Sequence, residues 1–194
     1  MMATTANANE PKDKNILILG DSLSAGLGVN YDQAWPSLLQ IRINKMGASY
    51  RVINAGVSGD TTSGGISRLP RLLKKYSPEI LILELGGNDG LRGTSLKAIK
   101  KNLRDMISSA QSNGITVLLI GVQLPPNYGA LYTKGFENIF SDLAKEYDLD
   151  LIQGSLKTMV NEGMMQSDGI HPNVSGHQQI ENIIWERLNK YLEK

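Results

Sequence analysis

The chain has 194 residues, enough for one sizeable hydrophobic core, and we predict a single domain over residues 15–194. Its 20 Lys and Arg residues nearly balance its 19 Asp and Glu residues, which argues against a nucleic-acid partner or binding to an anionic membrane. The absence of cysteine excludes disulfides, thiolate metal sites and a cysteine nucleophile, and no apolar run reaches the roughly 18 residues of a membrane helix, so no stable membrane insertion is expected.

The first 14 residues, MMATTANANEPKDK, are polar and predict a disordered N-terminal lead-in. They have neither the basic start nor the apolar centre of a secretory signal. The sequence therefore shows no intact signal peptide.

From residue 15 onward, short runs of Ile, Val and Leu alternate with longer segments of helical period, which is typical of β-α-β units. We expect strands at 15–19, 50–54, 80–85, 115–121 and 150–152. Apolar stripes over 96–110 and 136–147 predict helices that cover a sheet face. A last helix is predicted over 172–192, with Pro172 in its first turn. The predicted fold class is α/β with a parallel sheet.

Four loops that follow these strands combine glycines with small polar residues. They read GDSLSAG, AGVSGDTTSGG, GGNDGLRG and VQLPPNYG. Right-handed crossovers place the carboxyl ends of parallel strands at one edge of the sheet, where open α/β folds bind ligands. We therefore expect the functional site at that edge.

The first loop carries a candidate nucleophile, Ser22, at the point where a strand gives way to a helix. The partial positive charge at a helix N-terminus can stabilise the oxyanion that forms when a serine attacks a carbonyl. The alternative is purely structural, because Ser and Asp also cap helices well.

A serine nucleophile needs a base, and the chain has only two histidines. His171 lies three residues after Asp168 in SDGIHPN, so the carboxylate can accept the Nδ1–H of the ring and leave Nε2 to take the Ser22 proton. The alternative is a turn in which Asp168 caps the next helix and His171 is merely exposed. His177 lies in a helical segment, and we expect it at the surface.

An oxyanion needs hydrogen-bond donors, and two more loops offer them. Gly59 can present its backbone N–H and Asn88 its side-chain amide, in addition to the N–H of Ser22. The structural alternatives are a turn that needs positive φ at Gly59 and an Asx turn at Asn88.

The segments GDSLS, the glycine of VSGDT, GGND and DGIHP, in this order, resemble the four sequence blocks of the SGNH hydrolases, also called the GDSL esterase/lipase family. The resemblance spans nearly the whole chain. LELGGNDGLRG and LPPNYG are similar to a bacterial subgroup of multifunctional thioesterases and lysophospholipases and related arylesterases.

The resemblance implies a catalytic triad of Ser22, Asp168 and His171, with oxyanion donors at Ser22, Gly59 and Asn88. It implies a three-layer α/β/α, flavodoxin-like fold with strand order 2-1-3-4-5. The activity it implies is hydrolysis of small-molecule acyl esters and thioesters, with neither cofactor nor metal. It also implies a periplasmic or secreted location, with a cytoplasmic location as the alternative because no intact signal peptide is seen, and we expect a monomer.

The acyl group of such a substrate needs an apolar groove. Leu91 on one side and Leu124, Pro125 and Tyr128 on the other are the predicted substrate-binding residues. Glu84 is predicted to be a hydrogen-bonded structural carboxylate that supports the loops, because strand alternation directs it away from the strand end.

Other functions fit parts of this pattern. A carbohydrate O-acetylesterase would use the same triad, because family membership does not choose the acyl acceptor. A phosphate- or nucleotide-binding module could use the backbone of SGDTTSGG, although no P-loop lysine or G-x-G-x-x-G motif is present. A metal hydrolase would need Asp21, Asp89, Asp168 and His171 to converge. A conventional α/β-hydrolase is disfavoured because its G-x-S-x-G elbow is absent.

Overall fold

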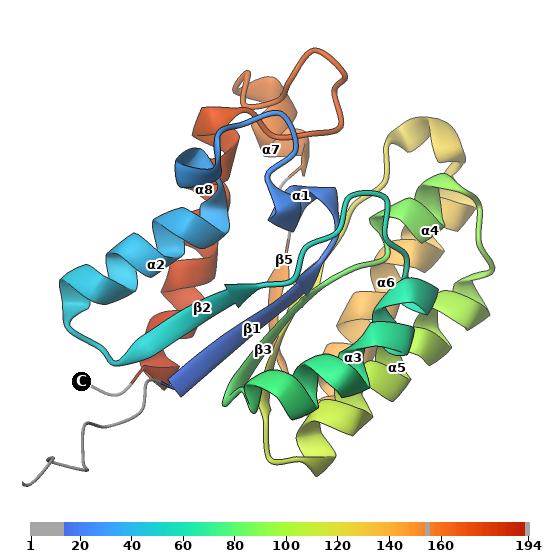
Figure 1. Ribbon diagram of the computed structural model, residues 1–194. Coiled ribbons are helices and arrows are strands. Elements are labelled where there is room, and N and C mark those ends of the chain that lie inside the picture. The colour runs from blue at the N-terminus through green and yellow to red at the C-terminus, as the bar shows by residue number, and fades with distance from the viewer. Residues whose placement is uncertain (1–13, 154–155, 193–194) are drawn as a thin grey trace, which may run out of the picture.

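A computed structural model describes residues 14–153 and 156–192 and contains a five-stranded parallel sheet. The strands are β1 (Lys14–Gly20), β2 (Tyr50–Asn54), β3 (Ile80–Glu84), β4 (Thr116–Gly121) and β5 (Asp150–Gln153). Their order is β2-β1-β3-β4-β5, and every neighbouring pair is parallel. The predicted fold class and strand order are confirmed (Figure 1).

The strand limits differ from the predicted ones by one residue or less. β1 starts at Lys14 and β3 ends at Glu84, while β4 starts at Thr116. The other residues of the predicted N-terminal lead-in, 1–13, lie outside the described residues.

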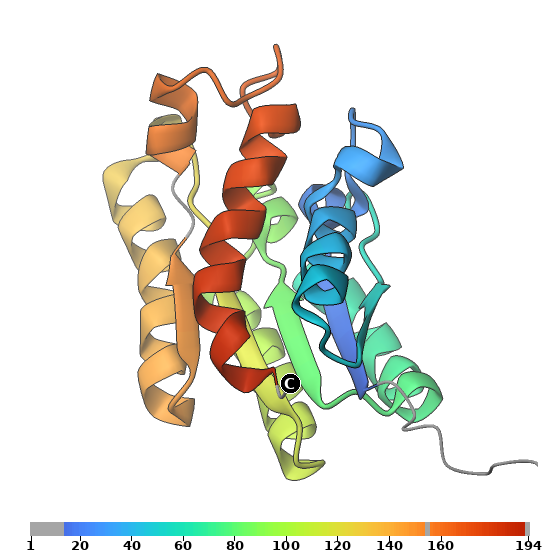
Figure 2. The same ribbon diagram turned by 90° about the vertical axis from the view of Figure 1, so that its left-hand side faces the viewer.

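Helices cover both faces of the sheet (Figures 1 and 2). On one face lie α2 (Trp35–Met46) and α8 (Val174–Leu188), and on the other lie α3 (Thr62–Tyr76), α5 (Leu96–Ser112) and α6 (Ala130–Tyr147). The central strands are buried on both sides, which explains their continuous Ile and Leu runs. Ile16, Ile18, Ile80 and Ile82 belong to the core on the α2 and α8 side, and the leucines between them belong to the other core.

The last helix starts later than predicted. Asn173 has an extended backbone, and its side chain accepts a hydrogen bond from the Gly176 N–H at 3.1 Å, so it is the N-cap of α8. Pro172 lies outside the helix and pairs with Met165 in an isolated bridge. The helix ends at Leu188 and continues as a 3-10 turn, η3 (Asn189–Tyr191).

Short helical turns follow the carboxyl ends of the strands. They are α1 (Ser22–Ala25), η1 (Tyr31–Gln33), α4 (Gly87–Leu91), η2 (Pro126–Tyr128) and α7 (Leu156–Asn161). All lie at one edge of the sheet, at the top of Figure 1. Of the described helices, none is long and apolar enough to cross a membrane.

Candidate active site

Ser22 is the first residue of α1, directly beyond the end of β1. The helix begins there because the Asp21 carboxylate caps it by accepting the Leu23 N–H at 3.1 Å. Gly20 permits the tight turn, since a Cβ at this position would lie 2.2 Å from Ser24 Oγ. Ser22 is 8% exposed, so its hydroxyl is largely shielded from bulk water.

A continuous chain of side-chain contacts links Ser22 to Asp168. His171 Nε2 lies 3.0 Å from Ser22 Oγ, and His171 Nδ1 lies 2.6 Å from Asp168 Oδ2. The other oxygen of Asp168 accepts the backbone N–H groups of Ile170 at 2.9 Å and His171 at 3.0 Å. One carboxylate thus orients both the ring and the backbone of the histidine.

The pKa of Asp168 is lowered to about 2, mainly by the hydrogen bond from the His171 ring and then by the two backbone N–H groups. The carboxylate is therefore charged at any pH at which an esterase assay is practical. It accepts the Nδ1–H of a neutral imidazole, which leaves the Nε2 lone pair directed at Ser22.

The three predicted oxyanion donors lie at adjoining positions. Asn88 Nδ2 donates to Asp60 O at 2.9 Å and to Asp21 Oδ2 at 3.2 Å, so its amide contacts the residues next to Gly59 and Ser22. In the described part of the chain, the N–H groups of Ser22 and Gly59 have no hydrogen-bond acceptor. Such backbone donors are free to bind a developing negative charge.

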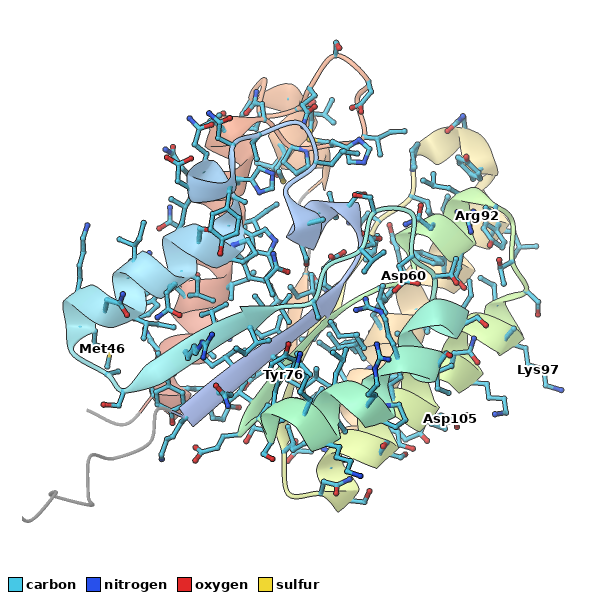
Figure 3. All side chains as sticks on the ribbon, viewed as in Figure 1. Met46, Asp60, Tyr76, Arg92, Lys97 and Asp105 are labelled. Carbon is cyan, nitrogen blue, oxygen red and sulfur yellow. The ribbon has the colours of Figure 1, made fainter. Side chains whose placement is uncertain are left out.

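Gly59 is required by its backbone conformation. Its φ is +78°, and a Cβ there would meet only Arg92 Nη2, at 3.9 Å. The Arg92 guanidinium donates to Gly59 O at 3.1 Å and fixes the loop from the direction of α4. Arg92 and Asp60 both lie among the loops at the active edge (Figure 3).

A cavity of about 220 Å³ opens beside Ser22 and His171 and is lined largely by apolar side chains. Of the four predicted substrate-binding residues, Leu91, Leu124 and Pro125 line it. Tyr128 does not, and it stands 36% exposed in η2.

Glu84 is closer to the site than the strand pattern indicated. It is hydrogen-bonded as predicted, because Oε2 accepts the Asp21 N–H at 3.2 Å and the Ser24 hydroxyl at 2.8 Å. It is nevertheless the last residue of β3 and lines the cavity, so its expected direction away from the strand end is wrong.

Two buried carboxyl groups therefore lie behind Ser22. Burial and the nearby charge of Asp21 raise the pKa of Glu84 well above its usual value. Burial also raises the pKa of Asp21, to about 6. Both shifts favour the neutral form of these carboxyl groups beside the Ser22 turn.

The prediction that His177 lies at the surface is wrong. Its side chain is fully buried, and Nδ1 accepts the Trp35 N–H at 3.3 Å. Ala34 precedes α2 and has no side-chain acceptor, so His177 caps that helix from α8. Burial lowers the pKa of His177 to about 4. The uncapped start of α2, AWP, is the only sequence signal for this role.

Two further residues that the sequence analysis missed tie the loops together. Arg68, on α3, donates to Gly20 O at 3.0 Å, to Ala55 O, and to the Asp60 carboxylate at 2.7 Å. Asp89, on α4, accepts the N–H and the hydroxyl of Thr62 at 2.8 and 2.7 Å. Their signal in sequence is only that each lies near a glycine-rich loop.

The four residues of the metal-site alternative do not form one cluster. Asp89 bonds to Thr62 while Asp168 bonds to His171. Among the described residues, no group of three or more His, Cys, Asp or Glu side chains is placed to hold a metal ion.

The comparisons with known proteins place the chain in a family. The family described as GDSL-like Lipase/Acylhydrolase matches residues 18–179. Esterase TesA of Pseudomonas aeruginosa is 42% identical over 180 residues, which are 92% of this chain and 90% of TesA. Thioesterase 1/protease 1/lysophospholipase L1 of Escherichia coli strain K12 is 42% identical over 159 residues, which are 81% of this chain and 75% of that protein. The crystal structure of TesA superposes with a TM-score of 0.87 at 42% identity, covering 91% of this chain and 99% of that one.

Proposed function

The chain belongs to the GDSL-like lipase/acylhydrolase family, and we propose that it hydrolyses acyl esters and thioesters through an acyl-enzyme on Ser22. Its relatives are named esterase and thioesterase/lysophospholipase, and this chain is likewise a serine hydrolase of ester and thioester bonds. The observation that carries the proposed mechanism is the hydrogen-bonded chain from Ser22 through His171 to Asp168.

In the proposed mechanism, His171 Nε2 takes the Ser22 proton as Oγ attacks the substrate carbonyl. Asp168 holds the Nδ1–H tautomer and stabilises the imidazolium that forms. The protonated ring then gives its proton to the departing alcohol or thiol, which leaves an acyl group on Ser22. Water, deprotonated by the same histidine, releases the acid.

The N–H groups of Ser22 and Gly59 and the Asn88 amide would hold the oxyanion of each tetrahedral intermediate. Asn88 Nδ2 is already fixed by Asp60 O at 2.9 Å. Its longer contact, 3.2 Å to Asp21, is the one that the oxyanion would replace.

The apolar cavity favours an acyl chain over an acetylated sugar, whose hydroxyls would need polar partners. A phosphate at the SGDTTSGG loop is disfavoured, because acceptors already occupy the start of α3. The Asp60 carboxylate accepts the Thr61 N–H at 2.9 Å, and Asp89 accepts the Thr62 N–H at 2.8 Å. A phosphate there would face two carboxylates.

The test is hydrolysis of p-nitrophenyl esters, palmitoyl-CoA, a lysophospholipid and an acetylated sugar by wild type, Ser22→Ala and Ser67→Ala. Ser67 is an exposed serine on α3 and serves as the matched control. We expect wild type and Ser67→Ala to cleave acyl esters or thioesters and Ser22→Ala to be inactive. Equal activity of Ser22→Ala would exclude Ser22 as the nucleophile, and cleavage of the acetylated sugar alone would favour the O-acetylesterase.

We also propose that the protein acts as a monomer and works in the periplasm or outside the cell, as the resemblance of its four blocks implies. Light scattering coupled to size-exclusion chromatography tests the oligomeric state, because a monomer has the chain mass of 21.2 kDa. Fractionation of cells that express the native gene tests the location.

A further inference from the structure

The cavity beside Ser22 crosses the carboxyl edge of the sheet and has two sides. Leu91 and Leu124 line the side that continues into the core beneath α5 and α6. The other side, which we call the α8-side chamber, belongs to the core beneath α2 and α8. Its lining residues include Trp35, Ile152, Met159, Ile180, Ile183 and Ile184.

On the first side, Leu124 is firmly packed. Leu124 is only 6% exposed and is part of the core between the sheet and α5 and α6. A Cβ on Gly90 would lie 2.6 Å from Leu124 Cδ2 and 3.0 Å from Phe136 Cε2, so Leu124 lies flat on the Gly90 backbone. An alkyl chain could pass there only by displacing a packed core side chain, which is costly in a close-packed interior.

The α8-side chamber offers apolar surface that the fold itself leaves partly uncovered. Ile180, Ile183 and Ile184 are spaced i, i+3 and i+4 and share one face of α8. Ile184 is 1% exposed, whereas Ile180 and Ile183 are only partly buried although both line the cavity. They face the end of β5, where Ile152 is buried, and α8 lies next to β5 in Figure 2.

The chamber is continuous with the reacting groups. Ser22 and His171 line the same cavity, together with Pro172, which follows the histidine and precedes α8. An acyl chain attached to Ser22 Oγ can therefore enter the part of the cavity that α8 and β5 line, where most of the lining residues are apolar. Burying its methylene groups against the partly buried Ile180 and Ile183 removes apolar surface from water on both partners.

We propose that the acyl chain of the substrate occupies the α8-side chamber and that Ile180 and Ile183 determine which chain lengths are accepted. This inference rests on the proposed acyl-enzyme at Ser22 and deepens it. The substrates it indicates carry an unbranched medium- or long-chain acyl group. Leu91 and Pro125 then contact the leaving group or the first carbons of the chain.

The test compares the kcat/KM for p-nitrophenyl dodecanoate with that for p-nitrophenyl acetate in single variants. In Ile183→Trp the indole fills the chamber, and we expect the dodecanoate-to-acetate ratio to fall roughly tenfold or more, with acetate hydrolysis retained. Ile180→Trp makes the same change one turn earlier and replaces Ile183→Trp if that variant does not fold. Ile41→Trp, at a 44% exposed position on α2, is the size-matched control and keeps the wild-type ratio.

Leu91→Trp tests the opposite side of the cavity, and we expect it to leave the ratio unchanged. An unchanged ratio in both α8 variants, or a fall confined to Leu91→Trp, would overturn the inference while acetate turnover still upheld the serine hydrolase. Failure of the proposed function has another signature, since wild type would then hydrolyse neither ester.

Discussion

The segment 168–171 and the turn 21–24 provide the two halves of one hydrogen-bonded chain, but they are held in different ways. Asp168 and His171 are three residues apart, and the carboxylate orients the ring and backbone of the histidine, while the nearby Gln166 N–H donates to His171 O at 2.8 Å. The Ser22 turn is held from β3 by Glu84, from α4 by Asn88 and from α3 by Arg68. The acid–base half is therefore local and exposed, whereas the nucleophile half is buried and depends on the whole sheet edge.

This difference predicts that substitutions in segment 168–171 lower kcat without changing the melting temperature. Asp168→Asn keeps an oxygen for the N–H groups of Ile170 and His171 but presents an amide to the ring. The imidazole then carries its proton on Nε2 and cannot accept one from Ser22. We expect kcat to fall roughly 10⁴-fold with an unchanged melting temperature.

The matched control for that substitution is Asp32→Asn, an exposed carboxylate in η1, which should keep wild-type kcat. Steady-state kinetics measures kcat of both variants, and thermal unfolding measures their melting temperatures. A loss of less than tenfold in Asp168→Asn would show that Asp168 does not set the tautomer.

On the buried half, one substitution should affect both rate and packing. Asn88→Ala removes an oxyanion donor and also the bond to Asp60 O. We expect kcat to fall roughly 10²–10³-fold and the melting temperature to drop by a few degrees, unlike Asp168→Asn. Asn113→Ala, at the exposed end of α5, is the control. A near-wild-type kcat would remove Asn88 from the oxyanion site.

The same division explains what the sequence could predict. The His171–Asp168 pair is a local spacing, and the strands are continuous apolar runs, so both were predictable. Leu124 lines the cavity as predicted, but its close packing against Gly90 is something that no local pattern indicates. The role of Glu84 depends on where β3 ends relative to β1, and that register joins residues 64 positions apart.

His177 shows the same limit in a helix. Its position in α8 gives no sign of burial, because the residue that it caps, Trp35, lies 142 positions earlier. Only the packing of α8 against α2 brings the two together. Pro172 was expected in the first turn of α8, but the helix begins at Val174, because the side chain of Asn173 accepts a helix N–H group and caps it.

The buried His177 leads to a prediction about how stability depends on pH. Burial lowers its pKa from 6.5 to about 4, so below pH 6.5 the unfolded chain takes up a proton that the folded chain does not. The contribution of His177 to stability should therefore fall from pH 6.5 to pH 4, by up to about 3 kcal/mol. His177→Asn keeps an acceptor where Nδ1 lies, but it cannot titrate.

Urea unfolding at several pH values measures this effect. We expect His177→Asn to be less stable than wild type at pH 8, because the ring leaves a cavity, but to lose less stability on acidification. The control is Asn113→Ala, an exposed substitution that removes no titrating group and should keep the acid slope of wild type. Equal slopes in wild type and His177→Asn would mean that the buried ring does not cause the acid sensitivity.

The smallest expected effect tests whether the buried half of the site needs a charge or only an acceptor. Glu84 holds the residues on both sides of Ser22 through one oxygen, and burial with the Asp21 charge keeps the pKa of Glu84 high. Glu84→Gln retains that acceptor, so kcat should stay close to wild type. Glu84→Leu leaves the Asp21 N–H and the Ser24 hydroxyl without their acceptor. We expect Ser22 to shift as a result and kcat to fall roughly tenfold.

Because burial and the nearby charge of Asp21 raise the pKa of Glu84 in the folded chain, the contribution of Glu84 to stability falls as pH rises above 4.5, and Glu84→Gln removes that contribution. The glutamine variant is then the more stable protein at pH 8 and an equally fast enzyme. A large loss of kcat in Glu84→Gln would instead show that the carboxyl group itself, and not its hydrogen-bond geometry, is required behind Ser22. In that case the nucleophile half would depend on a titrating group, as the histidine half does.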